Sequence, residues 1–252
     1  NLRYPPQFIQ VPSEEEAFTT LKSENIDLVI CMLNLEELDT FDLAKKIKSQ
    51  YPEIPIVVLT PFSREVSLKV SHEDLSAIDY IFSWLGNSDL LLAIIKLIED
   101  KMNAEHDTRE VGVQVVLLVE DSVRFYSSYL PNIYKIVFNQ SRSFTTEGLN
   151  EHQQMLRNRG RPKILLATNY EQAIGLYEKY KHSLLGIISD ISYRRRGKED
   201  PEAGFKLLKH VRAEDEFVPF LLQSSDEKFA SVAHEMNVGF INKNSKTLSI
   251  EL

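Results

Sequence analysis

Short apolar runs alternate with stretches of helical periodicity from Gln114 onward, and this alternation limits the fold more than any other feature of the chain. The apolar runs are VVLLV, PKILLAT, LLGIISD, VPFLLQSS and VGFINK. Strands that alternate with helices form βαβ units around a parallel sheet, and strands that are apolar along their whole length fit a sheet covered on both faces. We therefore expect an α/β domain over 113–252.

The first half of the chain repeats this pattern. Strands are expected at 7–12, 26–33, 54–60 and 77–84, and helices are expected at 13–25, 39–52, 64–74 and 88–103. The stretch 24–60 runs parallel to 183–225, which predicts two copies of one domain rather than a solenoid. Nothing before Gln7 matches VVLLVEDS, so we expect the first strand of the first copy to lie upstream or to be replaced by a partner.

The predicted bounds are 1–105 for the first copy, 106–112 for a linker and 113–252 for the second copy. The second copy has an insertion around 141–161 and a truncated last helix that begins near 245. The charged stretch 99–112 is the expected connection, and it could be a helix between the copies.

Charge is divided unevenly between the halves. Residues 1–106 hold 9 Lys+Arg against 18 Asp+Glu, whereas 107–252 hold 20 against 19. This difference fits two units with different surfaces, and it lacks the basic balance of a nucleic-acid-binding domain. The basic runs at 157–163 and 194–198 are expected to be solvated loops; a contact with a partner is the alternative.

The composition excludes several other classes. No apolar stretch is long enough for a transmembrane helix, and residues 1–6 lack the apolar segment of a secretory signal. The single cysteine, Cys31, cannot form an intramolecular disulfide. We expect a cytoplasmic protein without membrane contact, and the first residue, Asn1, suggests a fragment.

Acidic and polar side chains follow the strands of the second copy. The first strand is followed by Glu120 and Asp121, the third ends in Asp190, the fourth in Ser224 and the fifth in Lys243. The functional crevice of such a sheet lies beyond the carboxyl ends of its strands. Crowded carboxylates have raised pKa values unless a cation intervenes, and Mg²⁺ prefers oxygen ligands. A metal ion and an ammonium can neutralise the oxygens of a phosphoryl group, and a hydroxyl can donate a hydrogen bond to one of them. A carboxylate at such a site could act as the nucleophile that accepts the phosphoryl group.

These motifs resemble a known family. VEDS, the strand-ending SD, PFLLQSS and FINK are similar to the receiver domain of two-component response regulators, over all of 113–252. The resemblance implies two flavodoxin-like, doubly wound parallel sheets of five strands in the order 2-1-3-4-5. The first sheet would lack its first β-α unit in this chain.

The resemblance also implies roles for individual residues. Asp190 would accept a phosphoryl group from a histidine kinase, a phosphotransfer protein or a small phosphodonor. Mg²⁺ would be held by Asp190 together with Glu120, Asp121 and the main-chain carbonyl of Ser192.

Three further residues have roles by resemblance. Ser224 would be the switch hydroxyl, Lys243 would pair with the phosphate, and Phe240 would be the aromatic residue that moves inward. The second copy departs from the family in Asn244, which replaces a proline, in the longer arginine-bearing loop after Asp190, and in the insertion.

The first copy resembles the same family without its chemistry. Met32 stands where the acceptor aspartate belongs and Ser83 where the lysine belongs, whereas Thr60 and Tyr80 keep the hydroxyl and aromatic positions. We expect Met32 to be a core residue and this copy to be a pseudo-receiver that serves in docking, dimerisation or signal relay.

The expected output is a change of affinity for a downstream output region or effector, not turnover of a metabolite. A weaker resemblance links the whole stretch to tandem modules ahead of a phosphoenolpyruvate/pyruvate-binding, dikinase-like region. Two alternatives stay open. One is an interaction scaffold that works without phosphorylation, possibly as a homodimer. The other is an aspartate-nucleophile hydrolase, which Ser192 disfavours because that class needs a second acid there.

Overall fold

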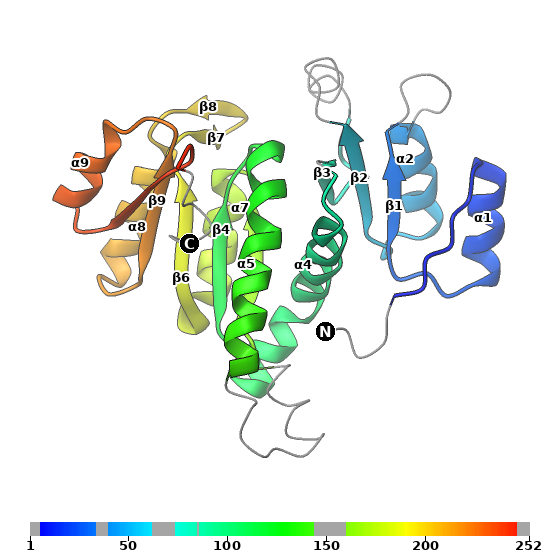
Figure 1. Ribbon diagram of the computed structural model, residues 1–252, viewed down its shortest axis with the longest axis horizontal. Coiled ribbons are helices and arrows are strands. Elements are labelled where there is room, and N and C mark those ends of the chain that lie inside the picture. The colour runs from blue at the N-terminus through cyan, green and yellow to red at the C-terminus, as the bar shows by residue number, and fades with distance from the viewer. Residues whose placement is uncertain (1–5, 34–39, 62–73, 85, 144–159, 246–252) are drawn as a thin grey trace. The chain divides into compact units, whose positions relative to one another are not determined.

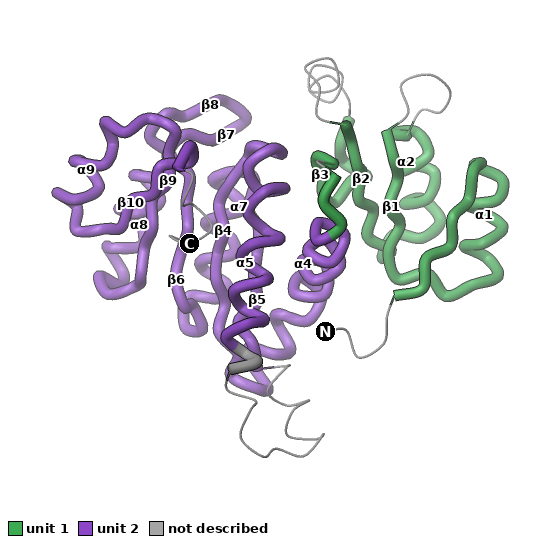
Figure 2. Tube along the Cα trace, in the orientation of Figure 1, with its two compact units in different colours: residues 1–88 green, residues 89–252 purple. Residues whose placement is uncertain are grey.

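The computed structural model describes residues 6–33, 40–61, 74–84, 86–143 and 160–245. The chain divides into two compact units, residues 1–88 and 89–252 (Figure 2). Both units contain helices and a parallel sheet. Within the described ranges, the search for a helix with the length and hydropathy of a membrane span finds none.

The first unit has three described parallel strands in the order β1-β2-β3. They are β1 (Val29–Met32), β2 (Ile56–Pro61) and β3 (Tyr80–Trp84). Helix α1 (Glu14–Ser23) begins after Ser13, whose hydroxyl oxygen accepts a hydrogen bond from Glu16 N at 3.3 Å. This bond makes Ser13 the N-cap of the helix, a position that serine favours. Helix α2 (Thr40–Gln50) buries Phe41, Ala44 and Ile47.

The strand predicted at 7–12 is wrong, because these residues have no regular secondary structure. Phe8 and Ile9 are 66% and 52% exposed. In the order 2-1-3-4-5 a second strand pairs only with the first, and β1 pairs only with β2 among the described strands. Residues 7–12 therefore have no neighbour with which to form ladder hydrogen bonds.

Three further expectations fall largely outside the described residues. They are the helix at 64–74, most of the insertion at 141–161 and the last helix after 245.

The second unit contains five parallel strands in the order β10-β9-β6-β4-β5 (Figure 1). Their bounds are β4 (Val115–Val119), β5 (Lys163–Ala167), β6 (Leu184–Asp190), β9 (Phe220–Ser224) and β10 (Gly239–Asn242). The chain passes from β4 to β5 on one side and then returns to β6 on the other side of β4. The carboxyl ends of β4 and β6 thus lie at the topological switch point, where open α/β sheets bind ligands.

Helices cover both faces of this sheet. Figure 1 shows α5 (Val123–Ser143) on one face, and α7 (Tyr170–Tyr180) and α8 (Ala203–Glu214) on the other. A short turn of 3₁₀ helix (Lys181–Ser183) follows α7, and α9 (Phe229–Glu235) precedes β10. The face of α7, α8 and α9 contains the largest apolar core of the unit. Burial on both faces explains why these strands read as uninterrupted apolar runs.

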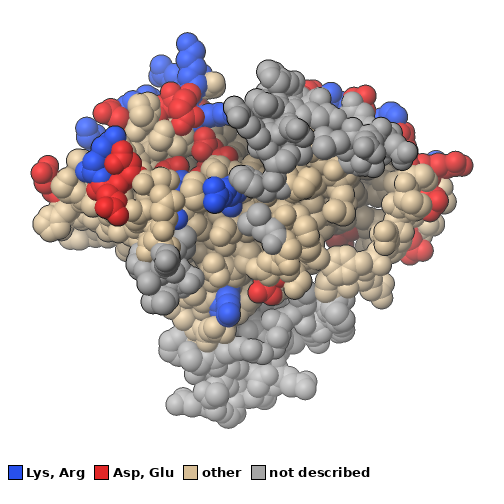
Figure 3. Space-filling view, turned by 45° about the horizontal axis from the view of Figure 1, so that its top comes forward, with Lys and Arg blue, Asp and Glu red and all other residues tan. Residues whose placement is uncertain are grey.

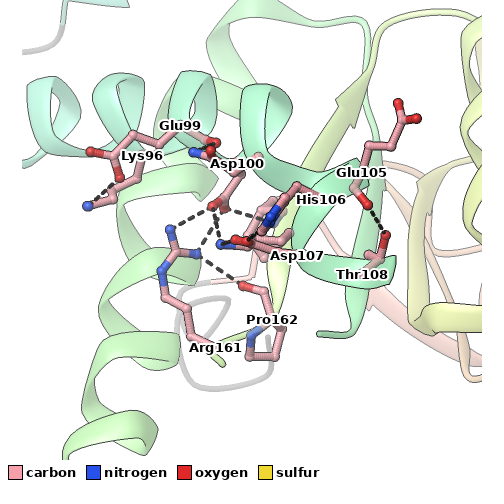
Figure 4. A network of polar contacts seen from close by, with 12 residues as sticks. Lys96, Glu99, Asp100, Glu105, His106, Asp107, Thr108, Arg161 and Pro162 are labelled. Atoms are coloured by element: carbon pink, nitrogen blue, oxygen red, sulfur yellow. Dashed lines mark hydrogen bonds and ion pairs between the residues drawn. The ribbon is translucent and has the colours of Figure 1, made fainter. Parts of the chain in front are cut away.

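Helix α4 (Asp89–His106) and the π-helical turn after it (Asp107–Val111) belong to the second unit. They are held there by a buried ion network (Figure 4). The Asp100 carboxylate accepts hydrogen bonds from both terminal nitrogens of Arg161, at 2.6 and 2.9 Å, and from Tyr134 Oη at 2.9 Å. Lys163 Nζ lies 2.7 Å from an Asp107 carboxylate oxygen.

This network changes two sequence-based expectations. The run at 157–163 was predicted to be solvated, but Arg161 and Lys163 are buried and ion-paired. The compact units divide the chain at 88/89, so α4 lies with the second unit although the repeat suggests the first. The predicted bounds at 105 and 113 remain a prediction about the repeat itself.

The long loop after Asp190 contains an antiparallel hairpin of β7 (Tyr193–Arg195) and β8 (Lys198–Asp200). Arg196 and Gly197 form its two-residue turn with φ values of 53° and 73°. Positive φ at both central residues is typical of a type I′ turn, which matches the twist of the strands it joins.

Helix α8 approaches the end of β6 very closely. Gly204 N donates to Ile191 O at 2.9 Å. A Cβ atom at position 204 would lie 2.3 Å from Asp190 O and 2.9 Å from Ile191 Cα. Glycine is therefore required where α8 packs on this strand end.

We expect Gly204→Ala to lower the free energy of unfolding by about 1–3 kcal/mol, because the added methyl group must displace backbone atoms. Gly175→Ala, in the interior of α7, is the matched control, since nothing lies within 4 Å of its Cβ position. It should raise stability by about 0.5–1 kcal/mol through helix propensity. Urea unfolding measures the change in the free energy of unfolding for each variant. Equal changes would contradict the close packing of α8 against the end of β6.

Asp100→Asn should lower the free energy of unfolding by about 3–5 kcal/mol, because it leaves the buried Arg161 guanidinium without its counter-charge. Glu105→Gln on the same helix removes only an exposed ion pair with Lys179 and should have little effect. Urea unfolding at neutral pH compares the two variants. If Glu105→Gln lowers the free energy of unfolding as much as Asp100→Asn does, the buried ion pair does not contribute more than the exposed one, and the prediction is wrong.

Candidate functional site

The structure brings together the acidic side chains that follow β4 and β6. Carboxylate oxygens of Glu120, Asp121 and Asp190 all lie within 4.8 Å of one another. Glu120 and Asp190 are buried and Asp121 is half-buried. The sheet order explains the juxtaposition, since β4 and β6 are adjacent and parallel.

Lys243, the residue after β10, reaches across the carboxyl edge of the sheet to two of these groups. Its Nζ lies 2.6 Å from Glu120 Oε2 and 2.5 Å from Asp190 Oδ2. Only 3% of its side chain is exposed, and the Nζ lies 4.5 Å from the centre of the Phe125 ring. The ammonium thus has three partners, two carboxylates and an aromatic face.

Other contacts fix the carboxylates individually. Glu120 accepts hydrogen bonds from Ser122 N at 3.0 Å and from Gln223 Nε2 at 3.1 Å. Asp190 Oδ1 accepts from Ile191 N at 2.7 Å. These bonds hold the two carboxylates at the edge of the sheet while leaving lone pairs on their oxygens.

The hairpin contributes to the rim of this pocket. The Asp121 carboxylate accepts a hydrogen bond from Arg194 N at 3.3 Å. Ser192 Oγ donates to Glu199 Oε1 at 2.8 Å, and Glu199 is a source of negative potential at Asp121.

Burial raises the pKa values of all three acids, and repulsion between carboxylates adds to this effect at Glu120 and Asp121. Burial, opposed by Lys243 and reinforced by Asp190, raises the pKa of Glu120 to about 8. Burial, with the charges of Glu199 and Asp190, raises the pKa of Asp121 to about 6. Burial also raises the pKa of Asp190, against the opposing effect of Lys243. The ammonium therefore compensates only part of the cost of burying these charges.

One more buried polar group belongs to these surroundings. Tyr129 is buried, its hydroxyl has no hydrogen-bond partner in the described part of the chain, and its ring stacks on Phe125. Burial and the charges of Glu120 and Asp190 raise its pKa. A set of carboxylate oxygens beside an unpaired hydroxyl fits a hard divalent cation with bound waters.

Two other predicted site residues, Ser224 and Phe240, have described contacts with other parts of the second unit. Ser224 is buried at the end of β9, and its hydroxyl oxygen accepts from Asp226 N at 3.2 Å. Phe240 is half-buried and packs against the main core of the unit. The switch roles of both residues and the metal-binding role of the Ser192 carbonyl stay predictions.

Sequence reasoning missed Gln223, Phe125 and Glu199. A glutamine in the otherwise apolar run FLLQS was a usable signal, because a buried amide needs polar partners. Phe125 looked like an ordinary apolar position of a helix. Glu199 could not be found, because its place depends on the hairpin.

Among the described residues of the first unit, the ends of β1, β2 and β3 carry no charged side chain. Met32 pairs with Leu59 in the register in which Asp190 pairs with Gln223, so it does occupy the position of the acceptor. The prediction that Met32 is a core residue is wrong, since it is 68% exposed at the end of β1, which pairs only with β2 among the described strands. Ser83 is buried and pairs with Thr60, whereas the partner of Ser224, the residue equivalent to Thr60, is Asn242. Ser83 therefore matches Asn242, and Trp84 matches Lys243, so the prediction that Ser83 takes the place of the lysine is wrong.

Comparison with known proteins places one part of the chain in a family. Residues 7–95 match the family described as "Response regulator receiver domain". Among curated proteins, the chain is 26% identical over 107 residues to "Transcriptional regulatory protein ZraR" of Klebsiella oxytoca, covering 42% of this chain and 24% of that protein. It is 30% identical over 103 residues to the protein of the same name from Salmonella typhimurium, covering 41% and 22%.

The matched stretch thus spans about a quarter of each relative or less. The chain carries a response regulator receiver domain at residues 7–95 and is distantly related to ZraR.

Proposed function

We propose that the second unit is also a receiver domain and accepts a phosphoryl group on Asp190. The observation that carries this proposal is the gathering of three carboxylates within 4.8 Å around strand ends, with Lys243 Nζ 2.5 Å from Asp190. A structural ion pair would need one carboxylate for one ammonium. Two further acids beside it, both with raised pKa values, favour a site that binds a cation.

The proposed reaction needs only groups of this pocket and a donor. An Asp190 carboxylate oxygen attacks the phosphorus atom and forms an acyl phosphate. The bond from phosphorus to the nitrogen or oxygen of the donor breaks, and its electron pair leaves with the donor. Lys243 can move from the carboxylate to a phosphoryl oxygen, because its Nζ already contacts the nucleophile.

Glu120 and Asp121, with Asp190 and the main-chain carbonyl of Ser192, would hold Mg²⁺. The bound ion would neutralise phosphoryl oxygens and so lower the cost of charge in transfer. The carboxylate donors fit this ion, which prefers oxygen ligands and keeps several waters.

The proposed output is a change in partner affinity. A phosphoryl group adds about −1.5 to −2 charges. Ser224 would exchange its bond from Asp226 N for one to the phosphate, and Phe240 would follow inward. The donor would be a histidine kinase or a phosphotransfer protein, and the recipient a downstream output region. The first unit, a pseudo-receiver in this proposal, would dock or dimerise.

A phosphorylation-independent scaffold is the second candidate. It is favoured by the first unit, which matches the receiver family although Met32 and Trp84 stand where the second unit has Asp190 and Lys243. Dimerisation without Mg²⁺, with no gain of a phosphoryl group by either unit, would support it.

We expect the intact protein to gain the mass of one phosphoryl group after treatment with acetyl phosphate and Mg²⁺. Asp190→Asn should abolish this gain, because an amide is not a nucleophile for phosphorus. Asp215→Asn, an exposed acid after α8, is the matched control and should behave as wild type. Intact mass spectrometry decides, and a gain that persists in Asp190→Asn would reject the assignment.

Mg²⁺ should bind more tightly as the pH rises. Glu120 and Asp121, with pKa values of about 8 and about 6, are protonated at low pH and must lose their protons to bind the ion. We expect the apparent Kd to fall by at least about tenfold between pH 6 and pH 8.5. Isothermal titration calorimetry measures this, and Glu120→Gln should flatten the dependence. A Kd independent of pH would contradict the described environment of Glu120.

A further inference from the structure

The β7–β8 hairpin carries cations that have no partner in the described part of the chain. The side chains of Arg194, Arg196 and Lys198 are exposed and form no ion pair or hydrogen bond there. Most other cations among the described residues of the second unit are paired, including the exposed Lys179 and the half-buried Lys181. Figure 3 shows basic side chains projecting beside acidic ones over this part of the unit.

The hairpin is held in a defined position beside the acidic pocket. Tyr193 is buried, and Arg195 lies 4.8 Å from the centre of the Tyr170 ring and 3.6 Å from Asp200. Arg194 N donates to the Asp121 carboxylate, and Arg196 N donates to Glu171 at 3.0 Å. The backbone that carries the unpaired cations is therefore fixed at the rim of the pocket.

We propose that this hairpin attracts the phosphoryl group of a small acyl phosphate dianion to the entrance of the acidic pocket. This inference rests on the proposed function of Asp190.

The pocket by itself repels such a donor. Glu120, Asp121 and Asp190 share a single ammonium, and Glu199 adds a further negative charge at the rim. An anion must approach this negative region before its phosphorus meets the nucleophile. Fixed positive charges near the entrance raise the local concentration of anions and the rate of encounter.

The charge balance of the hairpin supports this role. Four cationic residues, at positions 194, 195, 196 and 198, face two acids, Glu199 and Asp200. Arg195 is committed to Asp200, and Ser192 holds Glu199. The remaining cations keep their charge available for a ligand, and hydrogen bonds from the main chain of the hairpin engage Asp121 and Glu171.

The experiment measures the initial rate of Asp190 labelling by acetyl phosphate with saturating Mg²⁺, at about 0.01 M and about 1 M ionic strength. The Debye length falls from about 30 Å to about 3 Å over this range. The variant Arg194→Gln/Arg196→Gln/Lys198→Gln should label about three- to tenfold more slowly than wild type at low salt. At high salt the two rates should converge.

A matched variant removes three cations far from the pocket. Lys135, Lys179 and Lys209 lie in the middle or C-terminal part of helices that return from the carboxyl edge of the sheet. Lys135→Gln/Lys179→Gln/Lys209→Gln should label at the wild-type rate at both salt concentrations. Phosphoramidate, which has less negative charge at neutral pH, should show a smaller difference between wild type and the hairpin variant.

The outcomes separate the two proposals. If wild type gains no phosphoryl group, the proposed function fails. If wild type labels but the hairpin variant has the same rate and salt dependence, the hairpin inference fails. An equal loss with acetyl phosphate and phosphoramidate also overturns it, because that result indicates a distorted pocket and not an effect of charge. Thermal unfolding of the variant, expected at the wild-type temperature, checks that it folds.

Discussion

The second unit depends on one ammonium placed between two buried carboxylates. Lys243 follows the edge strand β10, yet its Nζ contacts Asp190 on β6 and Glu120 after β4. The side chain spans β9, where Gln223 supplies the only other side-chain donor described at Glu120. Burying a carboxylate without such a partner costs several kcal/mol. The buried carboxylates therefore need both Lys243 and Gln223, and the strand order brings these two side chains to them. Its residual negative charge makes the pocket a place for a cation.

The first unit shows that the sheet itself does not require this charge. Met32 and Leu59 pair in the register of Asp190 and Gln223, but they carry no ionisable group. The strand ends there are stable with Ser83 buried beside Thr60. The same parallel arrangement thus forms with and without the acidic pocket. The charges of the second unit are an addition with a cost in stability, which is the usual sign of a functional site.

Local patterns predicted what depends on local physics. The five strands of the second unit and the juxtaposition of Glu120, Asp190 and Lys243 follow from periodicity and from parallel strand ends. Features that depend on residues far apart in the sequence were not predicted. Residues 7–12 have strand-like composition but no neighbouring strand, and the exposure of Met32 reflects its place on an edge. Arg161 reads as a loop residue because Asp100, its partner, is 61 positions away.

The same contacts indicate which parts can respond to chemistry at Asp190. The backbone of this residue is rigid, since Gly204 packs against its carbonyl and Ile191 N donates to both Gln223 O and the Asp190 side chain. The loop after β9 is held by half-buried or exposed bonds, such as those from Asp226 N to Ser224 Oγ and from Asn244 Nδ2 to Ser225 O. Breaking one of these bonds costs far less than moving the strand. A charge added at Asp190 would therefore be transmitted through the loop after β9, and the sheet would remain a fixed support.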